Sequence, residues 1–488
     1  MRFRTTLAAA AGCAVLGAAQ ARAQDPTFTV RAPAPAGFSR AEAQATTLRH
    51  LQNLIRLDTQ NPPANELITA MYFDSVLTGV PGIEKQILRI PGDSMRMRAN
   101  FVARLRATHP RQKPVMVMGH MDVVGADTTK WDTDPFEPTF RDGYLYGRGA
   151  IDDKGMLAAT LTAMVQLAQQ RDRLDRDIIF FATAGEEGGP SVGVDWVMEH
   201  HRGLVGDAEF ALNEGGRIRL DNGAIRTVNI QTTEKVYYTV VATARGTSGH
   251  GSVPLPDNAL AALARAVNRV HEWRAPVRLN ETTRLYFQRL ATIEANAETR
   301  RAMEQLTVAG APQAQVDAAA AVLARDPLYN AVLRTGASLT LLNGGFRANV
   351  IPSEGRATFN VRILPGEDIR EIVRMMNQAG GEPQVTFTAE EEPVPAPPPS
   401  PVGTELFRAM EESARAMAPN ATVIPFMSTG ATDGAVLRAA GIPTYGILPM
   451  PLTMEDELRM HGDNERVPVP ALGWATEYLY RVLRQVAT

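Results

Sequence analysis

The stretches GHMDVV (residues 119–124) and GRGAIDDKGM (residues 147–156) decide how this chain folds. The first follows directly on the apolar run PVMVM (114–118), and the second leads into the apolar-periodic run MLAATLTAMVQLA (156–168). We interpret them as a strand end, a loop and a helix start. Open α/β sheets bind ligands where their strands end, so the polar residues at these junctions are the first candidates for a functional site.

His120 and Asp122 stand at the strand end, and Asp152 stands before the helix. Residues i and i+2 of a strand point the same way, so Asp122 could accept a hydrogen bond from the His120 ring and orient it toward a metal ion. Each residue also has a plainer interpretation. His120 could be an ordinary loop histidine, and Asp152 or Asp153 could be a helix N-cap.

Composition sets limits on the function. A chain of 488 residues is long enough for two or three domains, and its net charge of −3 is close to balance. No basic tract indicates nucleic-acid binding. After the N-terminal segment, no stretch is apolar enough to predict a membrane span.

The N-terminal segment MRFRTTLAAAAGCAVLGAAQARA (1–23) is typical of a cleaved secretory signal, which predicts a periplasmic or secreted protein. Its removal takes three arginines and no acid, so the net charge moves from −3 to −6. Cys13, the only cysteine, lies inside it, and a lipoprotein role for Cys13 stays open. The mature protein would have no disulfide, and its metal ligands would have to be histidines and carboxylates.

The order of predicted elements indicates one domain inserted into another. Residues 24–230 alternate strands and helices, which predicts an α/β domain with a mostly parallel, covered sheet. Residues 231–392 follow the split βαβ pattern of a small α+β domain, interrupted by a helical stretch at about 282–324. The proline-rich run EEEPVPAPPPSPVG (390–403) is a stiff connector, and residues 393–488 return to the α/β pattern.

Further candidate ligands lie along the chain. Glu186 and Glu187 follow the apolar strand DIIFFATAG (177–185), and Glu214 ends the next strand. Adjacent residues of an extended chain point to opposite sides, so one glutamate could bind a metal while the other faces a substrate. The plainer interpretation is a pair of solvated acids. His461 lies in the returning α/β part, and His250 lies in the inserted domain.

The ordered set of motifs resembles the M20 family of metallopeptidases and covers nearly the whole mature chain. The motifs are GHMDVV, GRGAIDDKG, AGEEGG, NEGG, GHGSVP, NVIP, NVR and MHGDNE. That family includes glutamate carboxypeptidases, aminoacylases, carnosinase-type dipeptidases and carboxypeptidase S-like enzymes. The resemblance implies a catalytic α/β domain interrupted by an inserted lid, often called the dimerisation domain.

The resemblance also implies roles for individual residues. His120 and Glu214 would bind one metal ion, Glu187 and His461 the other, and Asp152 would bridge both. Glu186 would be the general base and Asp122 the support of His120, while Asp153 keeps the N-cap role. Asp207 competes for the role of Glu214. Two zinc ions are expected, and manganese or cobalt is not excluded.

Residues of the inserted domain would complete the site. His250 would donate to the oxyanion, from the same chain or from a partner subunit in a homodimer formed through the lid. Asn349 and Arg362 would bind the free carboxylate of the substrate. The loop STGATDG (428–434), around Gly430, would contact the substrate backbone. The segment 279–332 departs from compact relatives, and it could enlarge the lid, cap the cleft or alter dimer contacts.

We therefore hypothesise an exported dinuclear zinc hydrolase that cleaves an amide bond next to a C-terminal carboxylate in short peptides. Within the same family, the alternative is an N-acyl amino acid amidohydrolase of the aminoacylase type. An alternative of another class is a non-catalytic peptide-binding homologue. All the expected metal-ligand and base positions carry competent residues, which favours an enzyme.

Overall fold

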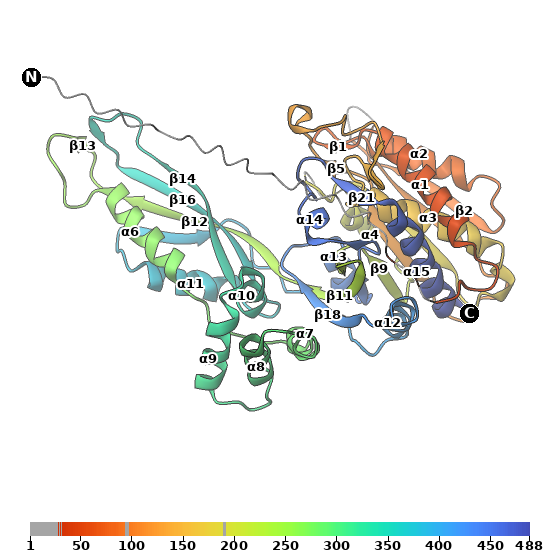
Figure 1. Cartoon of the computed structure of the whole chain (residues 1–488). Coiled ribbons are helices and arrows are strands. Elements are labelled where there is room, and N and C mark those ends of the chain that lie inside the picture. Colours follow the sequence, from red (N-terminus) through yellow and green to blue (C-terminus); the bar gives the residue numbers. More distant parts are fainter. Residues whose placement is uncertain (1–27, 29, 31, 93–96, 189–191) are drawn as a thin grey trace, which may run out of the picture.

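The computed structural model describes residues 28, 30, 32–92, 97–188 and 192–488. The predicted signal segment, with Cys13, lies outside these residues. The chain forms an α/β domain and an elongated lid that projects from it (Figure 1). None of the described helices is long and apolar enough to cross a membrane.

The α/β domain is built on a ten-stranded sheet. Its strands, in spatial order, are β2 (Ile83–Arg89), β3 (Ala99–Leu105), β8 (Ile178–Thr183), β4 (Val115–His120), β9 (Phe210–Asn213), β19 (Thr444–Gly446), β11 (Ala224–Glu234), β10 (Arg217–Asp221) and β20 (Pro451–Leu452), and β18 (Thr422–Ser428) pairs with β11.

The sheet is mixed. Strands β8, β4, β9 and β19 run parallel at its centre, while β2, β3, β10 and β11 add antiparallel pairs. The antiparallel pair β10–β11 has a local cause in the sequence, because Asn222-Gly223 forms the turn between them and both residues have positive φ. The pairs β10–β20 and β11–β18 are parallel as well. The α/β class with an inserted lid and a mostly parallel sheet is thus confirmed, and the antiparallel pairs make the sheet mixed.

Alternating side chains cover both faces of the sheet. Val115 and Val117 of β4 belong to one core, and Met116 and Met118 belong to the other. The first core is closed by α1 (Arg40–Arg56), α2 (Glu66–Leu77), α3 (Lys154–Ala168), α12 (Glu405–Met417) and α15 (Val469–Ala487), and the second by α4 (Val194–His200), α5 (Arg202–Val205) and α13 (Gly434–Ala439). Because both faces of β4 are buried, the sequence PVMVM around its start is a continuous apolar run and does not alternate.

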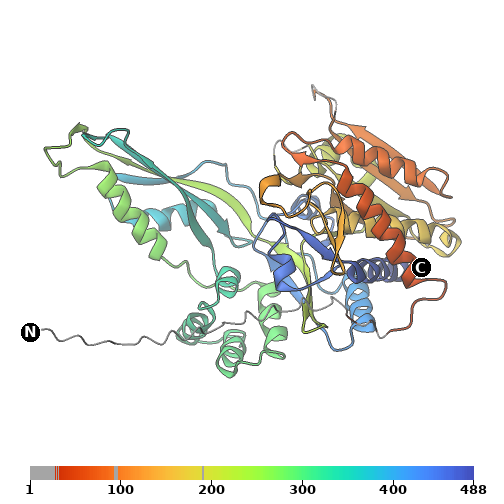
Figure 2. The same ribbon diagram turned by 45° about the horizontal axis from the view of Figure 1, so that its top comes forward.

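The lid is a four-stranded antiparallel sheet with two helices on one face (Figure 2). Its strands are β14 (Gly336–Gly344), β16 (Glu354–Ile363), β12 (Val236–Arg245) and β17 (Val385–Ala389), and its helices are α6 (Ala259–Glu272) and α11 (Ile369–Gly380). Strand β12 continues from β11 after Lys235, so one chain segment joins the domains. At the far tip, β13 (Gly249–His250) pairs with β15 (Val350–Ile351) (Figure 1).

Four helices form a separate unit beside the junction of the domains (Figure 1): α7 (Glu281–Ala291), α8 (Ala297–Leu306), α9 (Gln313–Leu323) and α10 (Pro327–Leu333). Their common core includes Ile424 and Met427 of β18, a strand of the α/β domain. The sequence placed this segment within residues 231–392 of the lid, but its packing joins it to the α/β sheet as well.

Small elements complete the chain. They are the pair β1 (Gln60–Asn61) with β5 (Val123–Val124), the sheet of β21 (Arg466–Pro468), β7 (Tyr144–Tyr146) and β6 (Thr139–Arg141), the helix α14 (Met454–Glu457), and 3-10 turns at Thr128–Lys130 and Arg171–Arg173. Because β21 pairs with β7, the segment that follows His461 lies beside the segment that precedes Asp152.

Candidate metal centre

Asp152 lies between two histidines from distant parts of the chain, His120 and His461. Its Oδ1 is 2.9 Å from Nε2 of His120, and its Oδ2 is 3.2 Å from Nε2 of His461. His120 ends β4, whereas His461 lies in the loop between α14 and β21 with a positive φ of 58°. The two oxygens of one carboxylate therefore face different imidazoles, which is the arrangement of a bridging ligand.

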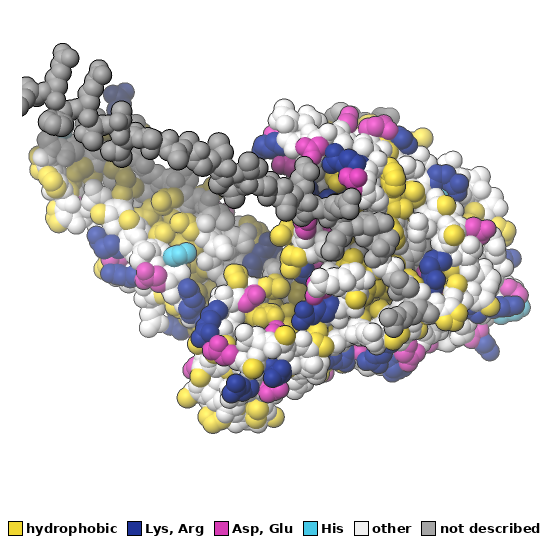
Figure 3. All heavy atoms as spheres, in the orientation of Figure 1, with side chains coloured by type: hydrophobic (Ala, Val, Ile, Leu, Met, Phe, Trp, Pro, Cys, Tyr) yellow, Lys and Arg dark blue, Asp and Glu magenta, His cyan; other side chains and the backbone are white. Residues whose placement is uncertain are grey.

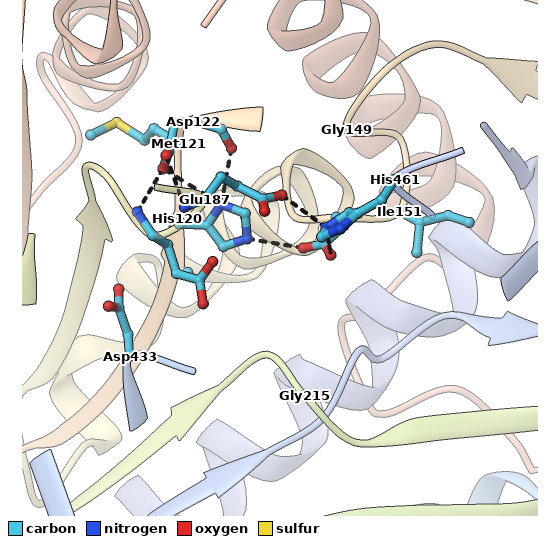
Figure 4. Close-up of polar contacts among 12 residues, drawn as sticks. His120, Met121, Asp122, Gly149, Ile151, Glu187, Gly215, Asp433 and His461 are labelled. Carbon is cyan, nitrogen blue, oxygen red and sulfur yellow. Dashed lines mark hydrogen bonds and ion pairs between the residues drawn. The ribbon is translucent and has the colours of Figure 1, made fainter. Parts of the chain in front are cut away.

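Glu187 and Glu214 extend this cluster. Oε1 of Glu187 is 3.1 Å from Nε2 of His461 (Figure 4). Ligand atoms of His120, Asp152 and Glu187 all lie within 4.8 Å of one another, which is close enough to share a metal ion. Glu214 is buried and lines the same cavity as Asp152 and His461. The structure thus gathers the five predicted ligands in one region.

The charges of this cluster are strongly coupled. Burial raises the pKa of Glu214 well above its usual range, and the charges of Asp152 and Glu186 add to the rise. Burial also acts on Asp152, but hydrogen bonds from His120 and His461 hold its pKa below the usual range. Hydrogen bonds to Asp152 and Glu187 raise the pKa of His461 to about 10. So many buried carboxylates need positive charge beside them, which metal cations would supply.

Glu186 lines the cavity next to the cluster. Burial raises its pKa to about 8, and the charges of Asp433 and Glu187 add to this shift. A carboxyl group with a pKa near neutrality can both accept and return a proton. Its position and its proton affinity fit the role of general base that the sequence predicted.

Asp122 supports the site differently from the prediction. Nδ1 of His120 lies 2.9 Å from the backbone carbonyl of Asp122 and 3.7 Å from its carboxylate, so the carbonyl is the nearer acceptor. The carboxylate instead accepts from the backbone N–H groups of Gly185, Glu186 and Glu187, at 3.0, 3.2 and 3.1 Å. The side-chain amide of Asn61 donates to it as well, at 2.8 Å. Asp122 therefore fixes the loop that carries both glutamates.

Glu465, which was not among the candidates predicted from the sequence, fixes the loop that carries Asp152. Its Oε1 accepts from the N–H groups of Ile151 and Asp152 at 2.7 and 3.2 Å, and its Oε2 accepts from Gly149 at 3.1 Å and from Arg148 at 2.7 Å. Glu465 and Arg148 are both buried. The available signal was the last letter of the motif MHGDNE, four residues after His461.

Arg148 connects this support to the other histidine. Besides Glu465, it donates to the backbone carbonyl of Gly462 at 2.9 Å, next to His461. Its guanidinium also lies over the ring of Trp131, 5.3 Å from the centroid. One buried ion pair thus holds the loops of Asp152 and His461 together.

Two further candidate acids, Asp153 and Asp207, differ in their surroundings. Asp153 occupies the N-cap position of α3, but its side chain makes no capping hydrogen bond, which corrects that expectation. It is fully buried, and burial raises its pKa well above the usual range. Asp207 forms a surface ion pair with Arg104 at 2.8 Å. Among the two acids that competed for one ligand position, only Glu214 lines the cavity.

The lid residues do not join the cluster within one chain. His250 is exposed at the far tip of the lid, where its Nδ1 lies 2.7 Å from the hydroxyl of Ser252 (Figure 1). Asn349 is at the same tip, and its carbonyl accepts from Gly251 at 2.8 Å. Arg362 is near the end of β16 that lies away from this tip, so Asn349 and Arg362 are far apart within one chain.

Arg362 lies at the end of the lid that adjoins the α/β domain. Its guanidinium stacks over the ring of Tyr237 at 4.8 Å, and its Nε donates to Asn360 at 3.1 Å. Burial lowers its pKa, and no carboxylate in the described part of the chain forms an ion pair with it. Its guanidinium group is therefore available to the carboxylate of a bound ligand.

The loop around Gly430 is tied to the start of the lid. Gly430 lines the cavity, and its N–H donates to the Ser428 hydroxyl at 3.1 Å. Glu234, the last residue of β11, accepts from the N–H and hydroxyl of Thr432 at 3.0 and 2.8 Å. In the same loop, Asp433 accepts from Thr183 at 2.7 Å, and burial raises its pKa to about 6.

Fold and site together define a metal-dependent hydrolase. The family model of Peptidase family M20/M25/M40 matches residues 116–485, so the chain belongs to this family of amide-bond hydrolases. The resemblance read from the motifs is confirmed.

Individual relatives share limited sequence identity with this chain. N-fatty-acyl-amino acid synthase/hydrolase PM20D1 of Homo sapiens is 26% identical over 392 residues, covering 79% of this chain and 76% of the relative. Probable carboxypeptidase S-like 2 of Dictyostelium discoideum is 28% identical over 380 residues, covering 76% of this chain and 71% of the relative. The crystal structure of the M20 family metallo-carboxypeptidase Sso-CP2 from Sulfolobus solfataricus aligns with a TM-score of 0.64 at 19% identity, over 90% of this chain and 99% of that one. That similarity shows the fold.

Proposed function

We propose that this protein is a dinuclear zinc amidohydrolase that releases an amino acid with a free carboxylate from an N-acyl amino acid or a short peptide. The position of Asp152 carries the proposal, because its two oxygens face His120 and His461 separately. Glu214 would complete one metal site with His120, and Glu187 the other with His461. Imidazole and carboxylate donors suit zinc, and they also accept manganese or cobalt.

The bound metals would activate a water molecule and polarise the attacked carbonyl. Glu186 lies in the same cavity wall, where it would accept the proton of that water and return it to the leaving amine. Asp122 holds the loop of Glu186 through three backbone N–H groups. The backbone that carries the proton acceptor is thereby held in place by the fold.

Two features support the substrate class. The guanidinium of Arg362 pairs with no carboxylate among the described residues, and it suits the free carboxylate of an amino acid product. PM20D1 is named for N-fatty-acyl amino acids, and the matched Sulfolobus protein is a carboxypeptidase. The apolar part of the cavity lining, at Tyr286, Leu290 and Phe426, favours an N-acyl amino acid over a peptide, and the peptide is the second candidate.

The function is tested by Glu186→Gln with a matched control, Glu199→Gln, on the exposed face of α4. Metal content is measured together with turnover of a panel of N-acyl amino acids and dipeptides. We expect Glu186→Gln to keep its metal and lose at least about 100-fold in kcat, because the general base is removed. Turnover of Glu199→Gln should equal that of the wild type. If the wild type binds metal but turns over no member of the panel, the proposed hydrolase function is wrong, and the alternative of a non-catalytic peptide-binding homologue is favoured.

We also propose a homodimer formed through the lid. Strand β14 is an edge of the lid sheet, and it and the following loop expose Leu341, Leu342 and Phe346 at 57%, 62% and 77%. Exposed apolar side chains along a free edge favour pairing with another strand. His250 lies far from the cluster of its own chain, and a partner subunit would bring it to the other active site.

Subunit mixing tests the dimer. Glu186→Gln and His250→Ala should each be inactive alone, and their mixture should regain activity if His250 acts on the partner's active site. Sedimentation of the wild type gives the oligomeric state independently. A monomer, or a mixture that stays inactive although hybrids form, would contradict the role in trans.

The proposed location is periplasmic or extracellular, on the strength of the N-terminal sequence 1–23. Mass spectrometry of the mature N-terminus tests it. Cleavage before Gln24 is the expected result.

A further inference from the structure

The helices α7–α10 form a fixed wall against the α/β domain. Helix α7 packs on β18, with the rings of Tyr286 and Phe426 6.0 Å apart and Arg289 donating to the carbonyl of Val423 at 2.8 Å. The hydroxyl of Thr282 also lies 2.8 Å from that of Thr232 in β11. Buried contacts of this kind hold the start of the helical unit in place relative to the active site.

The other end of the unit is anchored as well. The buried ammonium group of Lys235, between β11 and β12, donates to the carbonyl of Arg334 at 2.6 Å. Arg226 donates to the carbonyl of Ile293 at 3.2 Å. The unit is therefore fastened at its start, at its end and between α7 and α8.

A cavity of about 1060 Å³ joins this wall to the metal centre. One end is lined by Asp152, Glu186, Glu214 and His461. The other end is lined by apolar and aromatic side chains, namely Tyr286, Leu290, Leu328 and Tyr329 of the helical unit and Ile424 and Phe426 of β18. Figure 3 shows hydrophobic side chains in the hollow between the lid and the α/β domain. The same space that reaches the reacting atoms thus continues over an apolar surface.

Away from the metal centre, the charged side chains of the cavity have partners in the protein, and Arg217 donates to the backbone carbonyls of Gly215 and Gly216 at 2.6 and 3.1 Å. Arg219 forms an ion pair with Glu457 at 2.9 Å, and Arg226 lies 3.5 Å from Asp221. Glu455 binds Arg466 at 3.0 Å.

The two remaining acids of this wall, Glu294 and Asp326, accept hydrogen bonds within the helical unit. Glu294 accepts from the N–H of Asn296 at 2.7 Å, and Asp326 caps α10. The part of the wall that has no partner is the apolar part, which favours an apolar ligand over a charged peptide.

Leu290 and Tyr329 show how the wall presents this surface. Both are partly buried and pack against the common core of α7–α10. Both also line the cavity, so each side chain has one side fixed by packing and the other open to a ligand. A wall of this kind gives an apolar chain a rigid surface and removes it from water.

We propose that α7 and α10, with β18, form the acyl-chain subsite and set a preference for long aliphatic acyl groups. This rests on the proposed amidohydrolase function and deepens it. An acetyl group would fill little of the cavity, whereas a long chain would bury its methylenes against Leu290, Tyr286 and Tyr329. Each buried methylene favours binding, so the preference should grow with chain length.

The experiment compares Leu290→Trp, which fills the subsite, with Gln288→Trp on the exposed face of the same helix. The substrates are the acetyl, octanoyl and palmitoyl derivatives of one amino acid, and kcat/KM is measured for each. We expect Leu290→Trp to lower the octanoyl-to-acetyl and palmitoyl-to-acetyl ratios about 10-fold or more, since even one misplaced methylene in an apolar pocket costs about 10-fold. Gln288→Trp should leave both ratios unchanged.

Turnover of the acetyl substrate reports on folding and metal loading in the same preparation. A second variant, Leu328→Asp, places a charge on the other helix and should lower the same ratios. If both ratios stay at the wild-type value in Leu290→Trp and Leu328→Asp while the acetyl substrate is still cleaved, the proposed subsite is wrong. The proposed amidohydrolase function is then unaffected. If the wild type cleaves no acyl substrate and no dipeptide, the proposed function fails and the subsite with it.

Discussion

Replacing Glu465 by glutamine should weaken both the fold and metal binding, although Glu465 is not a predicted metal ligand. Its carboxylate accepts four hydrogen bonds, and all four donors belong to residues 148–152. In Glu465→Gln, the new NH₂ group would face donors, and Arg148 would lose its buried counter-charge. Breaking a buried ion pair in this way costs about 3–5 kcal/mol of unfolding free energy.

Metal affinity should fall as well. The N–H groups of Ile151 and Asp152 are aligned by the Glu465 carboxylate, and Asp152 is the residue between the two histidines. Groups that orient a metal ligand typically contribute about 10–100-fold to affinity. The assay is urea unfolding of the metal-free protein, combined with zinc competition against a chromogenic chelator.

Glu477→Gln is the matched control. Glu477 is also buried and accepts from Arg40 and Arg481, each at 2.9 Å, but it lies on α15 and makes none of the contacts around Asp152. It should lose stability and keep its zinc affinity. If both variants bind zinc equally well, the idea that Glu465 positions Asp152 is refuted.

Three further outcomes follow from the structure. Asp122→Asn should lower kcat about 10–100-fold in a folded protein, because the new amide opposes the N–H groups of residues 185–187, and steady-state kinetics with a circular dichroism control checks this. Removing the metals with a chelator should lower the urea midpoint, and zinc at about 100 times its Kd should restore about 2.7 kcal/mol. Burial lowers the pKa of Lys235 to about 8, below its value of about 10.4 in an unfolded chain. Between these pH values the unfolded state binds more protons, so wild-type stability gains up to about 3 kcal/mol as the pH rises, and Lys235→Met should lack this gain in urea unfolding at several pH values.

Local sequence patterns were sufficient for the elements that carry the site. The apolar run before His120 is buried on both faces of the sheet, and the run after Asp153 forms α3 at Lys154–Ala168. His120 and Asp152 were candidates because each lies at a break in such a pattern, and the resemblance of the ordered motifs to the M20 family supplied their roles. The mostly parallel sheet was predicted, but its antiparallel pairs were not, although Asn222-Gly223 is a local signal for one of them.

The sequence by itself determined which side chains could bind metal, through the resemblance of its ordered motifs to the M20 family. Only the tertiary structure decided which groups hold them in place, as with Glu465, which lies 313 residues from Asp152. It also placed His250 at the far tip of the lid and put the helices α7–α10 against β18, where they line the cavity of the metal centre. The physical reason is that periodicity records the burial of each segment, whereas the partner of a buried charge depends on which distant segment packs beside it.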